Sequence, residues 1–247
     1  MSVYTADGTQ TATKKFDDPS YAITALDAYE QHDSTRYLAV GLNMQGIRIL
    51  QVEQGANPND EKLTEVSAVA RHWYQPNLVF FQPNQVTMVK LGSDDQGKLI
   101  LTAGQFVKEQ PALETFEALT GKSVWWRNPR PWNLPWEWPD LADFGRLGAP
   151  GAQTEQLVAV SWPTLGRVSF IDAKEKTDWA TADGTAAHVV RFFTGTDGTG
   201  YVAIARDTAD GAGSYTISTA NPRGELVTVR EGAESGLPAA IAELTGA

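Results

Sequence analysis

Apolar residues along this chain gather in short runs that are separated by polar, glycine-rich segments, which is typical of a β-rich protein. The clearest runs are YLAVGL and IRILQVE in the first half, and LVAVSW and RVSFIDA in the second. Strict alternation of apolar and polar residues is poor in them. We therefore expect strands that are buried on both faces or half covered by helices.

Two hairpins are easier to place. VTMVK and KLILT flank a turn rich in Gly, Asp and Ser, and YVAIAR and SYTIST flank DTADGAG. Strand-forming residues on both sides of such turns indicate β-hairpins. A further strand, ELVTVRE, is expected after the turn residues Asn221, Pro222 and Gly224.

Three segments have the pattern of helices. DDPSYAITALDAYEQH carries a possible cap at Ser20, PALETFEALTG ends at Gly121, and LPAAIAELTG ends at Gly246. Before them, residues 1–19 are polar and rich in Thr, Asp and Gly, so we expect a flexible N-terminal tail.

The chain also contains what reads as the same unit twice. Tyr37–Ile49 aligns with Leu157–Ser169 at an offset of 120, which places Gly46 on Gly166. After a shift of four, Val86–Thr102 aligns with Val202–Ser218, and Gly97 then matches Gly213. We expect all four glycines in turns, with Gly46 and Gly166 at positive φ. A long fixed period of this kind indicates a duplication and a pseudo-twofold arrangement.

These patterns predict an α+β fold with two pseudo-symmetric halves around an antiparallel sheet. We place the first α/β half at 20–121, a Trp/Pro-rich crossover at 122–153 and the second half at 154–247, with the halves forming one compact unit.

The crossover holds five of the eight tryptophans, and its prolines exclude a long helix or a long central strand. We expect most of these indoles to be buried between the halves and one or two to form an exposed surface for a partner. Trp125 and Trp126 are consecutive, so they cannot both face one core in an extended chain. The candidate partner-binding residues are Trp125, Trp126, Trp132, Trp136 and Trp138.

Composition narrows the classes of function. With no cysteine, the chain has neither disulfides nor cysteine-based catalysis or metal sites, and its net charge of −10 disfavours nucleic acid and anionic membranes. We read no signal peptide and no apolar run long enough to span a membrane, so we expect a cytoplasmic protein.

No catalytic motif stands out. GSDDQGK has the glycine and lysine spacing of a phosphate-binding loop, but Leu99 replaces the required Ser or Thr and a strand follows, so we expect a hairpin turn. The three histidines have no metal-ligand spacing, and no serine lies in a nucleophile elbow. We therefore expect no cofactor, no metal and no enzyme activity. The exception to weigh is Glu137, Asp140 and Asp143 beside three tryptophans, a set that could bind or cleave sugars.

The run from Tyr201 onward resembles the C-terminal part of the EspG family, the chaperones of type VII (ESX) secretion. The shared pattern is a hairpin, a strand that ends in a Pro-x-Gly corner at Pro222, then ELVTV and a closing amphipathic helix. The resemblance implies two pseudo-symmetric α/β halves and a chaperone function, and no functional residue is carried over from it.

The sequence thus favours a non-catalytic, soluble protein that binds another polypeptide in a chaperone-like way, and the resemblance implies a role in type VII secretion. One alternative is a carbohydrate-recognising module or hydrolase that uses segment 125–143. The other is a structural subunit of a homo-oligomer.

Overall fold

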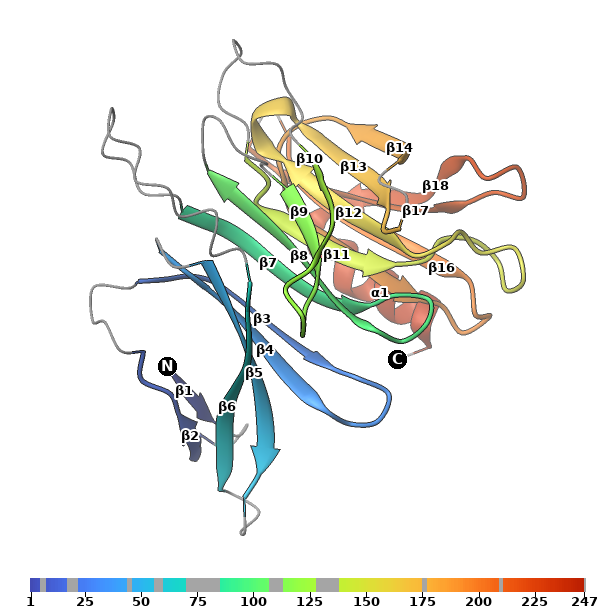
Figure 1. Ribbon diagram of the computed structural model, residues 1–247. Coiled ribbons are helices and arrows are strands. Elements are labelled where there is room, and N and C mark those ends of the chain that lie inside the picture. Colours follow the sequence, from blue (N-terminus) through green and yellow to red (C-terminus); the bar gives the residue numbers. More distant parts are fainter. Residues whose placement is uncertain are drawn as a thin grey trace. The chain divides into compact units, whose positions relative to one another are not determined.

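The computed structural model describes residues 1–4, 8–16, 22–43, 46–55, 60–69, 85–106, 113–127, 138–174, 177–208 and 211–246. Within these ranges nearly all regular structure is antiparallel β-sheet, and the one α-helix, α1 (Leu237–Thr245), lies near the C-terminus (Figure 1).

Four of the sheets have four strands each, and each strand pairs with its neighbours in sequence. The first sheet contains β3 (Ile23–Glu30), β4 (Arg36–Leu42), β5 (Gly46–Gln54) and β6 (Glu61–Val69). The second contains β7 (Gln85–Ser93), β8 (Leu99–Phe106), β9 (Leu113–Glu117) and β10 (Ser123–Arg127). The third contains β11 (Leu141–Gly145), β12 (Leu157–Trp162), β13 (Arg167–Asp172) and β14 (Asp178–Asp183). The fourth contains β15 (Ala187–Thr194), β16 (Gly200–Asp207), β17 (Gly213–Ala220) and β18 (Leu226–Ala233).

This architecture corrects the expected α+β class. Successive four-stranded antiparallel meanders are the repeating unit of β-propellers, and α1 is an addition to them. The expected helix at 17–32 is wrong over its described part, which forms β3. There Ala25 and Tyr29 pack on the core while Leu26 is exposed, so a period of two prevails over the helical spacing. The expected helix ending at Gly121 is wrong too, because Leu113–Glu117 is a strand, β9.

The chain divides into two compact units, residues 1–128 and 129–247. Segment 122–153, expected as a separate crossover, contributes β10 to the first unit and β11 to the second.

The first unit has two apolar layers around its first sheet. One layer lies between that sheet and β7–β10, and its largest members are Tyr37, Ile47, Ile49, Leu91, Leu101 and Phe116. The other face of the same sheet, with Val40 and Leu50, is covered by the hairpin of β1 (Ser2–Tyr4) and β2 (Gln10–Thr13). The expected flexible tail thus contains two paired strands, and Glu61 of β6 accepts a hydrogen bond of 2.7 Å from Thr11 of β2.

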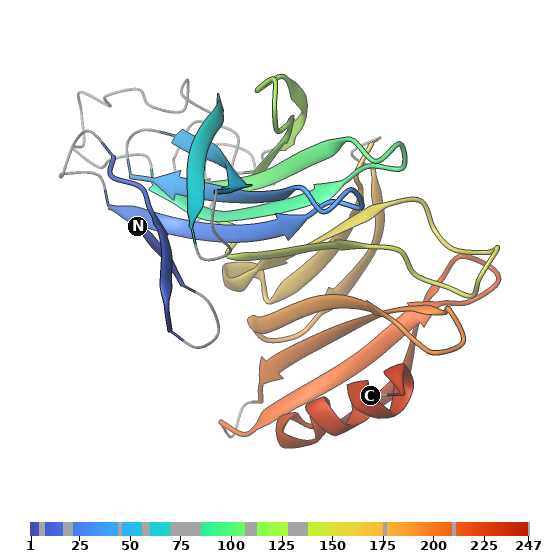
Figure 2. The same cartoon turned by 90° about the horizontal axis from the view of Figure 1, so that it is seen from below.

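The second unit repeats this layering with different elements. Phe170 lies between its two sheets in edge-on contact with Trp179 and Phe192, at centroid distances of 6.3 Å each. The far face of the fourth sheet is covered by α1, which packs Leu237 and Ala240 there (Figure 2). All six residues of β12 are buried, as the poor alternation of its sequence predicted.

Five hairpins use one turn geometry. In each, the first turn residue donates its N–H to the carbonyl four residues on, and the fourth residue donates back to the first. The fourth residue has positive φ in every case: Ser34, Gly97, Gly198, Gly211 and Gly224. This hydrogen-bond pattern places a left-handed residue at the fourth position, which explains why glycine predominates there.

An aspartate joins the two sheets of each unit at the same place. In the first unit the Leu91 N–H of β7 donates to Asp27 Oδ2 of β3 at 2.8 Å. In the second the Phe192 N–H of β15 donates to Asp143 Oδ2 of β11 at 2.7 Å. Both bonds run from the first strand of one sheet to the first strand of the next, and we name them the aspartate clamps.

Strand order decides which of the aligned segments correspond in the structure. Tyr37–Ile49 and Leu157–Ser169 both span the second and third strands of their sheets. The other aligned pair does not correspond, because β7–β8 are first and second strands whereas β16–β17 are second and third. The structural counterpart of β7–β8 is β15–β16, and the duplication itself stays a prediction.

Candidate functional site

The two consecutive tryptophans on β10 point in opposite directions. Trp125 pairs with Thr115 and is 6% exposed, whereas Trp126 pairs with Glu114 and is 51% exposed. The expectation that they cannot share one core is therefore confirmed. Of the other candidates, Trp138 is half-buried, and Trp132 and Trp136 lie outside the described residues.

Trp126 belongs to a small group of exposed apolar side chains on one hairpin. Leu119 in the β9–β10 turn is 46% exposed, and Val124 on β10 is 43% exposed. Since β10 is the outermost strand of its sheet, these side chains lie at a sheet edge. We call Leu119, Val124 and Trp126 the β10 patch. The sequence indicated an exposed indole but not the exposure of Leu119 and Val124, which look like ordinary turn and strand residues.

The backbone holds the β10 patch in a defined shape. Ser123 pairs with Phe116 and Trp125 with Thr115, so Val124 is the extra residue of a β-bulge. The buried indole of Trp125 anchors the strand beside it. The exposed side chains therefore project from a fixed backbone.

Three of the four turn glycines have the conformation expected of a turn. Gly46, Gly97 and Gly166 have φ of 72°, 76° and 58°. At Gly166 an added Cβ would also collide with the carbonyl oxygen of Gly184. Gly213 differs: it is the first residue of β17, and the left-handed residue of that turn is Gly211, with φ 79°.

The acids proposed for sugar chemistry do not converge in the described residues. Glu137 lies outside them, and the Asp143 carboxylate holds the Phe192 amide in its clamp. Burial raises the pKa of Asp140, although a hydrogen bond from Ser161 opposes the shift. The raised pKa of Asp140 fits a general acid, while the Asp143 carboxylate already accepts the hydrogen bond of its clamp.

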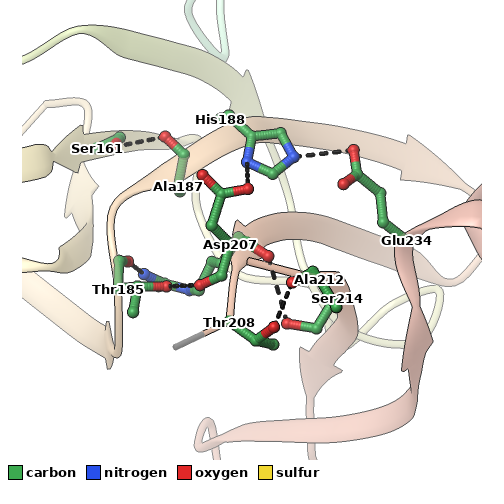
Figure 3. A network of polar contacts seen from close by, with 10 residues as sticks. Ser161, Thr185, Ala187, His188, Asp207, Thr208, Ala212, Ser214 and Glu234 are labelled. Carbon is green, nitrogen blue, oxygen red and sulfur yellow. Dashed lines mark hydrogen bonds and ion pairs between the residues drawn. The ribbon is translucent and has the colours of Figure 1, made fainter. Parts of the chain in front are cut away.

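His188 is the centre of a polar network that the sequence did not suggest (Figure 3). It is the extra residue of a bulge in β15, since Ala187 pairs with Arg206 and Val189 with Ala205. Its Nε2 lies 2.8 Å from Glu234 Oε1, and its Nδ1 lies 3.8 Å from Asp207 Oδ1. A catalytic base needs one ring nitrogen directed at a nucleophile or substrate. Here both nitrogens face carboxylates, so the network ties β15 to the segment that leads into α1.

The Arg206 side chain forms further hydrogen bonds next to the His188 network. It donates to the carbonyl of Ala182 at 2.8 Å and to that of Thr185, and burial lowers its pKa. Sequence spacing gives no hint of this network, because its members are distant along the chain.

No three His, Cys, Asp or Glu side chains among the described residues are arranged to hold a metal ion. In the same part of the chain, no helix is both long enough and apolar enough to cross a membrane.

Comparison with known proteins gives distant structural likenesses. No protein-family model and no curated protein matches the chain. The chain is similar to the crystal structure of BBS1N in complex with ARL6DN, soaked with lead, at 14% identity and a TM-score of 0.40, over 83% of this chain and 66% of that one. It is also similar to the C-terminal WD40 domain of Sif2, at 11% identity and a TM-score of 0.25, over 81% and 82% of the two chains.

The chain thus spans just under two thirds of the length of the first of these structures. TM-scores below 0.5 do not establish a shared fold, so the architecture is assigned from strand pairing alone. The comparisons do not bear on the EspG resemblance, which stays a prediction. The local pattern behind it is present as β16, β17, β18 and α1, but in an all-β setting.

Proposed function

We propose that this protein is a non-catalytic binder of other polypeptides and that the β10 patch is its contact surface. The main support for this proposal is that Trp126 is 51% exposed on a strand that the buried Trp125 anchors. Tryptophan is enriched among residues that dominate interface energies, and a rigid backbone lowers the entropy lost on binding.

A chaperone role in type VII secretion is the finer form of this proposal. It is supported only by the resemblance of the C-terminal run, and the β10 patch lies outside that run.

Selection of peptides from a displayed random library on the wild-type protein tests the proposal. We expect the Trp126→Ala variant to bind the selected peptides at least about tenfold more weakly, as for an interface anchor. Tyr4→Ala is the matched control, because Tyr4 is an aromatic residue with 57% exposure on β1 of the same unit.

The control variant should bind as the wild type does. Failure to select any peptide, or equal affinity of the wild type and Trp126→Ala for the selected peptides, would refute the proposal.

A further inference from the structure

The far face of the fourth sheet is an apolar surface that α1 covers only in part. The strand residues buried there are Ala203, Ala205, Tyr215 and Ile217. Three further apolar side chains of the same face stay half-buried: Val189, Phe193 and Tyr201. The rings of Phe193 and Tyr201 are stacked, with their centroids 5.5 Å apart. A ligand larger than α1 could therefore bury more of this face than α1 does.

The helix α1 shows which shape fits the face (Figure 2). The side chains that it packs on the sheet are Leu237, Ala240, Ile241 and Leu244. Their spacing is i, i+3, i+4 and i+7, the pattern by which amphipathic helices bind apolar grooves of other proteins. The face thus already holds an amphipathic helix, which the same chain supplies.

The attachment of α1 is weak. A helix of nine residues is too short to be stable by itself in water, and no side chain caps its first turn. Two side-chain contacts help to attach it: Glu243 to Arg230 at 2.7 Å, and Glu234, just before the helix, to His188 at 2.8 Å. Both contacts are accessible to solvent, and such contacts contribute little to stability. Leaving the sheet therefore costs α1 mainly its few apolar contacts.

One cation on this face has no counterpart in α1. Arg191 of β15 pairs in register with Ala203, so its exposed side chain lies on the same face as Ala203. Within the part of the chain that the structure describes, the Arg191 guanidinium forms no ion pair or hydrogen bond. The only charged residue of α1 is Glu243, which pairs with Arg230 on β18, at the opposite edge of the sheet. A helix with a carboxylate on its other flank could pair with Arg191 as well.

We infer that the far face of the fourth sheet binds an amphipathic helix of a partner polypeptide, which displaces α1. The partner helix carries apolar residues at i, i+3, i+4 and i+7 and a carboxylate that pairs with Arg191. In the absence of the partner, α1 occupies the face. This surface belongs to the other unit than the β10 patch, so the inference does not depend on whether the β10 patch binds.

Fluorescence anisotropy with a labelled peptide of residues 234–246 tests the inference on the full chain. Ala240→Asp places a charge on the buried side of α1, so α1 of that variant should leave the face open to the peptide. We expect this variant to bind the peptide at least about tenfold more tightly than the wild type, in which the tethered α1 competes. Ala239→Asp is the matched control: Ala239 is exposed on the same helix, and this variant should bind as the wild type does.

Glu243→Ala is a milder variant that keeps the apolar contacts of α1 and loses only the pair with Arg230. We expect it to bind the peptide about two- to threefold more tightly than the wild type, and it decides the question if Ala240→Asp does not fold. Equal binding by Glu243→Ala and the wild type would overturn the inference and make α1 a fixed cover of the sheet. Equal binding by Ala239→Asp and Ala240→Asp would overturn it too.

A second peptide, with Pro238→Glu, tests the role of Arg191. Pro238 lies about 140° round the helix from Glu243, on the flank toward β15. We expect both Ala240→Asp and Glu243→Ala to bind this peptide about threefold more tightly than the first, and high salt to remove the gain. Adding Arg191→Ala to either variant should abolish the gain. A gain that persists without Arg191, or no gain at all, would overturn the carboxylate pairing.

Discussion

Removing one aspartate clamp should destabilise one unit by a predictable amount. In Asp143→Ala the Phe192 N–H loses a carboxylate acceptor at 2.7 Å in a partly buried site. Hydrogen bonds to charged groups contribute about 1.5–3 kcal/mol, and partial exposure favours the lower end, so we expect a loss of about 1.5–2 kcal/mol. Asp143→Asn keeps an acceptor oxygen and should lose about half as much.

Because the two clamps are equivalent, the same loss of stability can be tested in both units. Asp27→Ala should give a similar loss in the first unit, since its acceptor lies 2.8 Å from the Leu91 nitrogen. Asp183→Ala is the control, because this aspartate is exposed, pairs with Arg167 at 2.8 Å on the surface and should contribute less than about 1 kcal/mol.

Two measurements check these values. Urea unfolding gives the free energy of unfolding of each variant, and amide hydrogen exchange reports on the Phe192 and Leu91 N–H groups individually. Unchanged exchange of the Phe192 amide in Asp143→Ala, or an equal loss in Asp183→Ala, would show that the clamp does not hold the sheets together.

Three further predictions concern backbone and charge. Gly166→Ala should lose more than about 2 kcal/mol of stability, because a left-handed φ and a steric collision combine there. Gly224→Ala has open space around it and should lose only about 1 kcal/mol. Equal melting temperatures of the two variants would contradict this prediction. Ser34→Gly should stabilise the protein by about 0.5 kcal/mol in thermal unfolding. The φ of 63° strains a serine, and relief of this strain outweighs the greater conformational freedom that glycine gives the unfolded chain. A loss of stability would contradict this prediction. Burial raises the pKa of Asp27 above 3.8, so the folded state holds its proton at a pH where the unfolded state does not. The wild type should therefore gain stability relative to Asp27→Asn as the pH falls from about 7 through that pKa, and a parallel pH dependence in urea unfolding would contradict the assignment.

Local turn chemistry was the most predictable part of the fold. The β7–β8 and β16–β17 hairpins, β18 and α1 all lie where Gly, Asp and Pro in the sequence predict turns between the elements. The pairing of Gly97 with Gly213 was two residues out of register at the turn, since Gly211 holds the left-handed position. Short apolar runs led to the two wrong helices, because β3 and β9 are too short for their period to separate strand from helix.

The four-stranded sheets recur with little sequence identity for a physical reason. The four sheets share strand order, and three of them share a hairpin turn geometry, which many sequences can satisfy, so little sequence identity accompanies them. The aspartate clamps are the clearest recurring side-chain contact, and their two aspartates lie 116 residues apart on strands that the sequence alignments did not include. For the candidate site, the sequence could indicate an exposed indole, but exposure of Leu119 and Val124 follows from pairing register.

The sheet edges show why exposed apolar residues gather where they do. The last strand of every four-stranded sheet contains a bulge, and the extra residues are Val66, Val124, Trp179 and Val229. Three of them are among the exposed large apolar side chains of the described residues. Bulges protect an edge from pairing with another chain, so each outer strand can present an apolar side chain without inviting strand addition. In the first unit this arrangement leaves Val124 and Trp126 exposed, two residues apart, on an edge strand that the bulge protects.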